Sequence, residues 1–193
     1  MPRPKTYDRD EVLDRAIEVF WSRGYEGASI QHLVDRMGIN RGSIYDTFGD
    51  KHHLFLAALD RYEVVFHTRM REALDDARSP RRAIQRVFDT IIQECACDEG
   101  RKGCFLTNSA VELSGHDHDT EARVRDNFLR LEQAFEKTLQ AGIERGEISE
   151  RHHPKAMARF LTSSLQGLRV MSKARPNRMV LRDIAKVTLS SLD

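Results

Sequence analysis

The chain contains 193 residues, of which 40% are hydrophobic and 7% aromatic, and its formal net charge is +1. This length allows one sizeable core, or one small and one medium domain, and no apolar run approaches the roughly 18 residues of a membrane-spanning helix. The opening residues MPRPKTYDRDE lack the apolar segment of a signal peptide, and the three cysteines show no disulfide spacing. We therefore expect a cytoplasmic protein with no membrane partner.

The first predicted helix covers residues 8 to 23. Leu13, Ala16, Ile17 and Phe20 repeat at helical spacing, which gives this helix one apolar face, and Gly24 marks its end. We expect this face to form the core on which the next two helices pack.

Residues 29 to 48 predict two short helices joined by a tight turn. The first helix carries one apolar stripe, formed by Ile30, Leu33, Val34 and Met37. Ser29 stands at its N-cap position, Gly38 offers the positive φ that ends it, and Asn40 is the N-cap candidate of the second helix. A helix-turn-helix of this kind places its second helix in the major groove of DNA.

The second short helix is predicted to turn a polar face to the solvent. Only Ile44 and Phe48 share an apolar face, so Gly42 and Asp46 point farthest from the core. Ser43 and Tyr45 lie on the flanks of that outer face. Such a face is suited to reading base edges.

These residues carry a family resemblance. The run MGINRGSIYDTFGDKHHLF, with the first helix ahead of it, resembles the DNA-binding domain of TetR-type one-component transcriptional regulators. Residues 7 to 62 share the motif, which fixes several unlike residues at fixed offsets. Val34 departs from the small Ala that the family often has beside the turn. Beyond residue 62 the likeness is one of general layout, and GCFLTNSAVEL is similar to a subgroup of these regulators.

A net charge of +1 gives little general attraction to DNA, so phosphate contacts have to come from individually placed groups. We expect them from a basic N-terminal arm and from cations beside the second short helix. The predicted DNA-binding residues are Lys5, Ser29, Gln31, Asn40, Arg41, Gly42, Ser43, Tyr45 and Lys51.

The rest of the chain also reads as helix, and no segment alternates apolar and polar residues long enough to predict a strand. One helix begins near Lys51, and the next follows DARSPRR with Ser79 as N-cap and Pro80 as first residue. Further helices are expected at 103 to 113, 118 to 145, 153 to 174 and 177 to 192. About nine helices result, so we expect an all-α fold. Residues 1–50 would form the DNA-binding domain, and residues 51–193 an effector-binding and dimerisation domain.

The resemblance implies a small-molecule effector held in the apolar middle of the chain. Asn108 and Glu112 lie one turn apart and would be its polar anchors, although a helix cap or an interhelical hydrogen bond is the favoured explanation for the pair. The full set of predicted effector contacts is Phe66, Met70, Ile91, Cys95, Cys104, Phe105, Asn108, Glu112, Phe128, Leu131 and Phe160. For each residue taken singly, a place in the ordinary core is the favoured explanation.

The resemblance also implies a homodimer formed through the last two helices. A helix-turn-helix reader gains affinity from paired half-sites, and small residues on the first of these helices would allow close approach of a second copy. The predicted interface residues are Leu161, Ser164, Leu165, Gly167, Leu168, Leu181, Ile184 and Thr188. Closure of the monomer core is the alternative explanation.

Two clusters suggest other chemistry. His116 and His118 in GHDHDTE are possible metal ligands, but Thr120 and Glu121 replace the Asp and His of a metallohydrolase pattern, so a loop that caps the next helix is favoured. The cysteines at 95, 97 and 104 could sense oxidants, and Cys104 follows two cations near a helix start.

No catalytic constellation is recognisable in the sequence, so we expect no enzyme, no cofactor and no metal. The sequence predicts a dimeric DNA-binding regulator, most simply a repressor that a small molecule releases from its operator. The alternative is a thiol or metal sensor on the same scaffold, and a helical enzyme is the more distant one.

Overall fold

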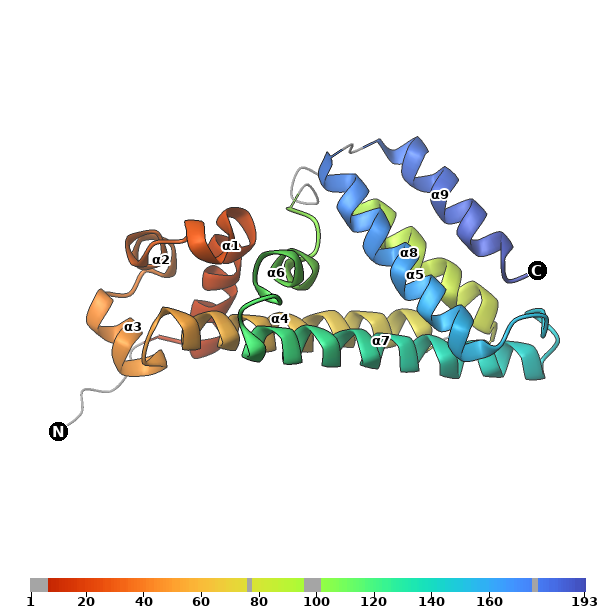
Figure 1. Cartoon of the computed structure of the whole chain (residues 1–193), viewed down its shortest axis with the longest axis horizontal. Helices are drawn as coiled ribbons and strands as arrows, with labels where there is room; N and C mark the ends of the chain where they lie inside the picture. Colours follow the sequence, from red (N-terminus) through yellow and green to blue (C-terminus); the bar gives the residue numbers. More distant parts are fainter. Residues whose placement is uncertain (1–6, 76–77, 96–101, 175–176) are drawn as a thin grey trace. The chain divides into compact units, whose positions relative to one another are not determined.

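The computed structural model describes residues 7–75, 78–95, 102–174 and 177–193, with Cys95 described by its backbone alone (Figure 1). These residues form nine α-helices and no strand, which confirms the predicted all-α fold. The helices are α1 (Arg9–Gly27), α2 (Ile30–Met37), α3 (Arg41–Phe48), α4 (Lys51–Leu74), α5 (Pro80–Cys95), α6 (Phe105–Leu113), α7 (His118–Glu144), α8 (Pro154–Ala174) and α9 (Arg178–Ser190). Among the described residues, no helix is long and apolar enough to cross a membrane.

The chain divides into two compact units. Unit 1 comprises Met1–Val65 and Phe105–Val124, and unit 2 comprises Phe66–Cys104 and Arg125–Asp193. This division differs from the predicted boundary between residues 50 and 51. The difference arises because α4 and α7 each contribute residues to both units and because α6 packs on α1.

Unit 1 is built around the apolar face of α1. Its predicted core residues Leu13, Ala16, Ile17 and Phe20 are all buried, which confirms that face. The Phe20 and Phe55 rings meet edge to face with their centroids 5.2 Å apart, so α1 and α4 share one aromatic core. On the polar side, the Arg61 guanidinium of α4 donates to the carboxylates of Asp10 and Asp14 on α1 at 2.8 to 3.0 Å. Helices α1 and α4 are therefore joined through both apolar and ionic contacts.

The end of α1 differs from the expected stop at Gly24. Gly24 has φ 74° and ψ 174°, which interrupts the helix, but one further turn follows and ends at Gly27. The backbone N–H groups just after such a break lack the usual acceptor four residues earlier. They need an acceptor from elsewhere in the fold.

Unit 2 contains a helical core formed by α5, α8 and α9. Helix α5 starts as predicted, because Pro80 is its first residue and the Ser79 hydroxyl accepts from the Arg82 N–H at 3.3 Å. The side chains of Ile84, Val87, Phe88, Ile91 and Ile92 are buried, which confirms the predicted inner face of α5. Helix α8 packs on α5 and on α9, as Figure 1 shows.

Candidate DNA-binding surface and effector region

Three local predictions about the helix-turn-helix are confirmed. The Ser29 hydroxyl caps α2 by accepting from the His32 N–H at 3.1 Å, and His32 Nδ1 accepts from the Ser29 N–H at 3.2 Å. Gly38 ends α2 with φ 70°. Asn40 caps α3 through Oδ1, which accepts from the Ser43 N–H at 2.8 Å. These caps supply partners for orphan N–H groups of two helices that are only eight residues long.

The outer face of α3 is polar and open. Ile44 and Phe48 are buried, so the opposite side of this helix faces outward. Arg41, Gly42 and Asp46 are exposed, whereas Ser43 and Tyr45 are half-buried at the flanks. This pattern follows from the helical period, because residues two positions from a buried side chain lie on the opposite side.

Arg41 and Tyr45 contact each other on this face. Arg41 Nη2 donates to Tyr45 Oη at 3.4 Å, and the guanidinium carbon lies 5.6 Å from the centre of the Tyr45 ring. A positive group and a phenolic hydroxyl are thus presented together, which suits contact with a phosphate oxygen or a base edge.

Lys51, the first residue of α4, lies against an aromatic ring that sequence reasoning did not associate with it. Its Nζ is 4.4 Å from the centre of the Tyr25 ring, a cation–π distance. The Tyr25 ring in turn packs at 4.9 Å from Phe55. Burial, and then the charges of Glu26, Asp50 and Asp117, raise the pKa of Tyr25, so its ring stays neutral at physiological pH.

Two other predicted DNA-binding residues have different surroundings. Lys5 lies outside the described residues. Gln31 is exposed on α2, where its Nε2 donates to Asp35 Oδ1 at 2.7 Å. Gln31 therefore remains accessible, although its amide already has one partner.

The Glu112 carboxylate accepts two backbone hydrogen bonds from α1. Its Oε2 accepts from the Tyr25 N–H at 3.0 Å and its Oε1 accepts from the Glu26 N–H at 3.0 Å. The carboxylate thus supplies the acceptors that the backbone needs after the break at Gly24. The interhelical alternative is confirmed. The effector-anchor role stays a prediction, and in this conformation both carboxylate oxygens are engaged within unit 1.

The other predicted effector contacts fall into two separate groups. In unit 1, Phe105 packs edge to face against Phe55 and Tyr62, and Asn108 is half-buried. In unit 2, Phe128 is half-buried, and the side chain of Cys95 lies outside the described residues. The buried members of unit 2 are Phe66, Met70, Ile91, Cys104 and Leu131.

Phe160 lies on the surface of α8. Its side chain is 47% exposed on α8, so it lies on the outside of unit 2 and not in its buried core, and its contact with an effector stays a prediction. The helical spacing of α8 suggested an inward position because both faces of this helix carry apolar residues.

Phe66 has a charged neighbour that the sequence pattern did not reveal. The Arg169 side chain is only 6% exposed, and its guanidinium carbon lies 5.3 Å from the centre of the Phe66 ring. Its Nη2 lies 3.6 Å from Glu94 Oε2. A guanidinium keeps its charge when buried, so this part of unit 2 holds a permanent positive charge beside apolar side chains.

A second polar pair in unit 2, between half-buried His67 and buried Asn127, joins α4 to α7. Asn127 Nδ2 donates to His67 Nε2 at 3.0 Å, which requires a neutral imidazole nitrogen as acceptor. Burial, and then the charge of Arg130, lower the pKa of His67. Hydrogen bonding and charge both favour the neutral ring.

Helix α8 has two apolar faces, and the predicted dimer interface mixed them. Leu165 and Leu168 are completely buried within unit 2, and Leu161, Leu181 and Thr188 are buried as well. In this conformation they form the core with α5 and α9, as the alternative of core closure predicts, and the interface itself stays a prediction. The exposed apolar residues of α8 and α9 lie on the other sides of these helices: Phe160, Val170, Met171, Met179 and Val187.

Three members of the predicted interface remain accessible. Gly167 is exposed, and a Cβ built on it would meet nothing within 4 Å. Ser164 and Ile184 are half-buried at the edges of the exposed faces. Gly167 lies on the same side of α8 as Phe160, since seven residues make almost two full turns.

The GHDHDTE segment forms the start of α7. Asp117 caps this helix, because its Oδ1 accepts from the N–H groups of Asp119 and Thr120 at 3.1 and 3.2 Å. This confirms the predicted capping loop. His116 and His118 are exposed, and the described part of the chain contains no group of three His, Cys, Asp or Glu residues placed to hold a metal ion.

Two family models match the chain. The model described as bacterial regulatory proteins of the tetR family matches residues 12–58, and the tetracyclin repressor-like C-terminal domain matches residues 80–187. The first match contains α2 and α3, and the second contains α5 to α8 with most of α9.

Similar proteins cover the whole chain. An uncharacterised HTH-type transcriptional regulator of Bacillus subtilis, YezE, is 36% identical over all of both chains. The HTH-type transcriptional repressor ComR of Escherichia coli is 30% identical over 97% of this chain and 90% of its own. A solved structure of the TetR family regulator CifR, a cysteine mutant complexed with 26-bp double-strand operator DNA, matches all of both chains with 30% identity and a TM-score of 0.86.

The capped helix-turn-helix, the nine described helices and these full-length matches agree with one another. The chain belongs to the TetR family of DNA-binding transcriptional regulators.

Proposed function

We propose that the protein is a homodimeric repressor that binds a two-fold operator and is released from it by a small molecule. The observation that carries the DNA-binding part is the outer face of α3, where exposed Arg41, Gly42 and Asp46 lie opposite the buried Ile44 and Phe48. A rigid helix with a polar outer face is what a major groove accepts. Repression is favoured by the resemblance to ComR, which is named a repressor.

The contacts are assigned by chemistry. Arg41 and Tyr45 carry donors at the start and middle of α3, and Lys51 carries a compact ammonium at the start of α4. We assign Lys51 and the Tyr45 hydroxyl to phosphates, and Arg41 to a base edge or phosphate. Gly42 and Ser43 allow close approach of the helix, while Ser29 and Asn40 hold the two helix starts in place.

The dimer is assigned to the exposed faces of α8 and α9. Several large apolar side chains lie there at helical spacing, and exposed apolar groups of this size are the usual mark of an interface. Gly167 and Ser164 would let a second copy of α8 come close. A two-fold axis through this surface presents two α3 helices to two half-sites.

The effector is assigned to unit 2, beside Phe66, Met70, Ile91 and Leu131. These side chains are apolar and buried, and Arg169 supplies a charged group beside Phe66. The effector can release the operator only if it binds the two conformations of the dimer with different affinity.

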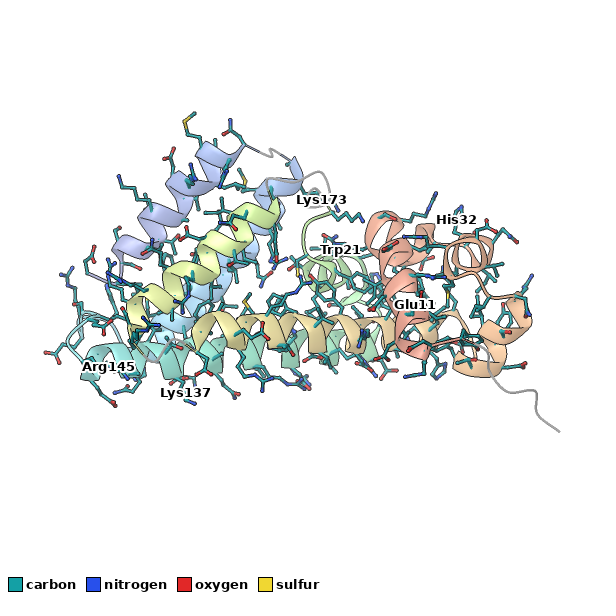
Figure 2. The ribbon with its side chains drawn as sticks, turned by 180° about the vertical axis from the view of Figure 1, so that it is seen from behind. Glu11, Trp21, His32, Lys137, Arg145 and Lys173 are labelled. Atoms are coloured by element: carbon teal, nitrogen blue, oxygen red, sulfur yellow. The ribbon has the colours of Figure 1, made fainter. Side chains whose placement is uncertain are left out.

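The test is footprinting on the promoter region beside the protein's own gene, followed by affinity measurements on the protected sequence. We expect a protected, nearly palindromic site. Lys51→Ala should weaken binding on every sequence and reduce the slope of log affinity against log salt by about 0.9 for each lost phosphate contact. Lys137→Ala, on the exposed face of α7 (Figure 2), is the control. Unchanged affinity in a folded Tyr45→Ala, Lys51→Ala double variant overturns the contact assignment.

A further inference from the structure

Glu112 occupies an anion-binding turn in the backbone of α1. The left-handed φ of Gly24 turns the next two N–H groups in one direction, and successive N–H groups arranged in this way bind anions. The Glu112 carboxylate fills the turn, with one oxygen 3.0 Å from each backbone nitrogen. This interaction joins residues 87 positions apart in the sequence.

The close fit extends to Gly24 itself. A Cβ at this position would lie 2.8 Å from both carboxylate oxygens of Glu112, which is nearer than real Cβ contacts. A side chain at residue 24 would therefore displace the carboxylate, in addition to straining the backbone at φ 74°. The position of the Glu112 carboxylate thus requires glycine at residue 24.

The same turn positions the ring on which Lys51 rests. Tyr25 supplies one of the two N–H groups, and its ring is held by Phe55 at 4.9 Å and by Phe20 at 6.3 Å. Lys51 Nζ lies over that ring at 4.4 Å. The ammonium is attached to a flexible side chain with four rotatable carbon–carbon bonds, so without the ring it would sample many positions.

We propose that Glu112 is a positioning residue for operator binding, which holds the Tyr25 backbone so that the Tyr25 ring fixes the Lys51 ammonium where it meets a DNA phosphate. This proposal rests on the phosphate contact assigned to Lys51 above. Because Glu112 belongs to α6, it also makes the phosphate contact depend on the position of α6 within unit 1. A displacement of α6 that lengthens the two hydrogen bonds weakens operator binding without any change in α3.

The experiment compares Glu112→Gln with Glu121→Gln. Both variants lose one negative charge, and Glu121 is exposed in the first turn of α7 in the same unit. Loss of a negative charge by itself strengthens attraction to DNA. If Glu112→Gln lowers the operator affinity while Glu121→Gln leaves it unchanged or raises it, the loss of a charge cannot explain the lower affinity. Glutamine keeps one acceptor oxygen, so this variant is expected to fold.

Operator binding, amide hydrogen exchange and denaturant unfolding together define the expected result. Operator affinity of Glu112→Gln falls several-fold, and its salt slope decreases in the direction of the Lys51→Ala slope, by up to about 0.9 per half-site. Glu112→Gln causes little further loss in a Lys51→Ala background, because the two residues act through one contact. The amide hydrogens of Tyr25 and Glu26 exchange faster in Glu112→Gln than in the wild-type protein, while denaturant unfolding still shows one folded state.

Each contrary outcome has its own meaning. If Glu112→Gln lowers stability and affinity but leaves the salt slope unchanged and adds fully to Lys51→Ala, Glu112 is merely structural and the inference is overturned. Wild-type affinity at every salt concentration for Glu112→Gln overturns it as well. If Lys51→Ala itself changes neither affinity nor slope, the assigned phosphate contact fails, and the positioning role fails with it.

Discussion

The His52 imidazole donates from Nε2 to Asp117 Oδ2 at 2.7 Å and thereby joins the first turn of α4 to the start of α7. Asp117 also caps α7 and accepts from the Thr120 hydroxyl at 2.8 Å. Burial alone raises the pKa of Asp117, but the hydrogen bonds from His52 and Thr120 outweigh it and hold the pKa below its ordinary value of 3.8.

The first prediction follows from this lowered pKa. A carboxyl whose pKa is lower in the folded state binds more protons when unfolded, so its contribution is present above pH 3.8 and is lost as the pH falls through the folded pKa. Asp117→Ala should lower the free energy of unfolding by about 1 kcal/mol at pH 7 from the lost cap alone. Urea titrations at pH 7 and pH 3 measure the difference. A wild-type advantage that is equal at both pH values contradicts this account.

The second prediction concerns the pH dependence of stability near neutral pH, which depends on His67. Its pKa lies below the ordinary value of 6.5, and protonation of Nε2 removes the acceptor for Asn127. The unfolded chain therefore binds the proton first, so stability should fall as the pH drops below 6.5 toward the folded pKa. His67→Gln should reduce this pH dependence, measured as the free energy of unfolding at pH 7.5 and 5.5. The control is His118→Gln, whose ring is fully exposed. An equal effect of the two variants argues against a neutral His67 that accepts from Asn127.

Assembly and folding should respond to different faces of α8. Gly167→Leu places a bulky side chain where the monomer has open space, so it should leave the free energy of unfolding of unit 2 nearly unchanged and weaken the dimer. Leu165→Ala removes a fully buried side chain and should cost about 2 to 5 kcal/mol of stability. Sedimentation at several protein concentrations, with Lys137→Leu as the control, separates the two effects. If the Gly167→Leu dimer dissociates no more readily than the wild-type dimer, the interface does not include Gly167.

Cys104 should react slowly in the folded protein. Its side chain is 2% exposed, and a buried thiol is protected from alkylating reagents even beside cations. In a background with serine at positions 95 and 97, maleimide labelling should become fast only after unfolding. Rapid native labelling, together with operator release that Cys104→Ser abolishes, would instead favour the sensor alternative.

The sequence was sufficient for features whose partners are close along the chain. Ser29, Gly38 and Asn40 act on groups within a few residues, so their roles follow from spacing and residue type. Glu112 meets Tyr25 across 87 positions, and no local pattern distinguishes that use of a carboxylate from an effector anchor. Arg169 beside Phe66 was missed for the same reason.

The mixing of two faces in the predicted interface on α8 has another physical origin. Leu161, Leu165 and Leu168 repeat with the helical period, but so do the exposed Phe160, Gly167 and Met171. The period of the apolar residues identifies those that share a face of the helix. It does not say whether that face packs on the chain's own core or binds a second copy of the chain. The burial of each side chain separates the two.

The brevity of α2 and α3 has a genetic consequence. Each has eight residues, fewer than the roughly 12 to 15 that an isolated helix needs to persist in water. Both therefore depend on the buried contacts of Leu33 and Ile44 with the rest of unit 1. A screen for constitutive expression of the regulated genes should then recover many alleles that change these two interior positions, although neither side chain ever touches the operator.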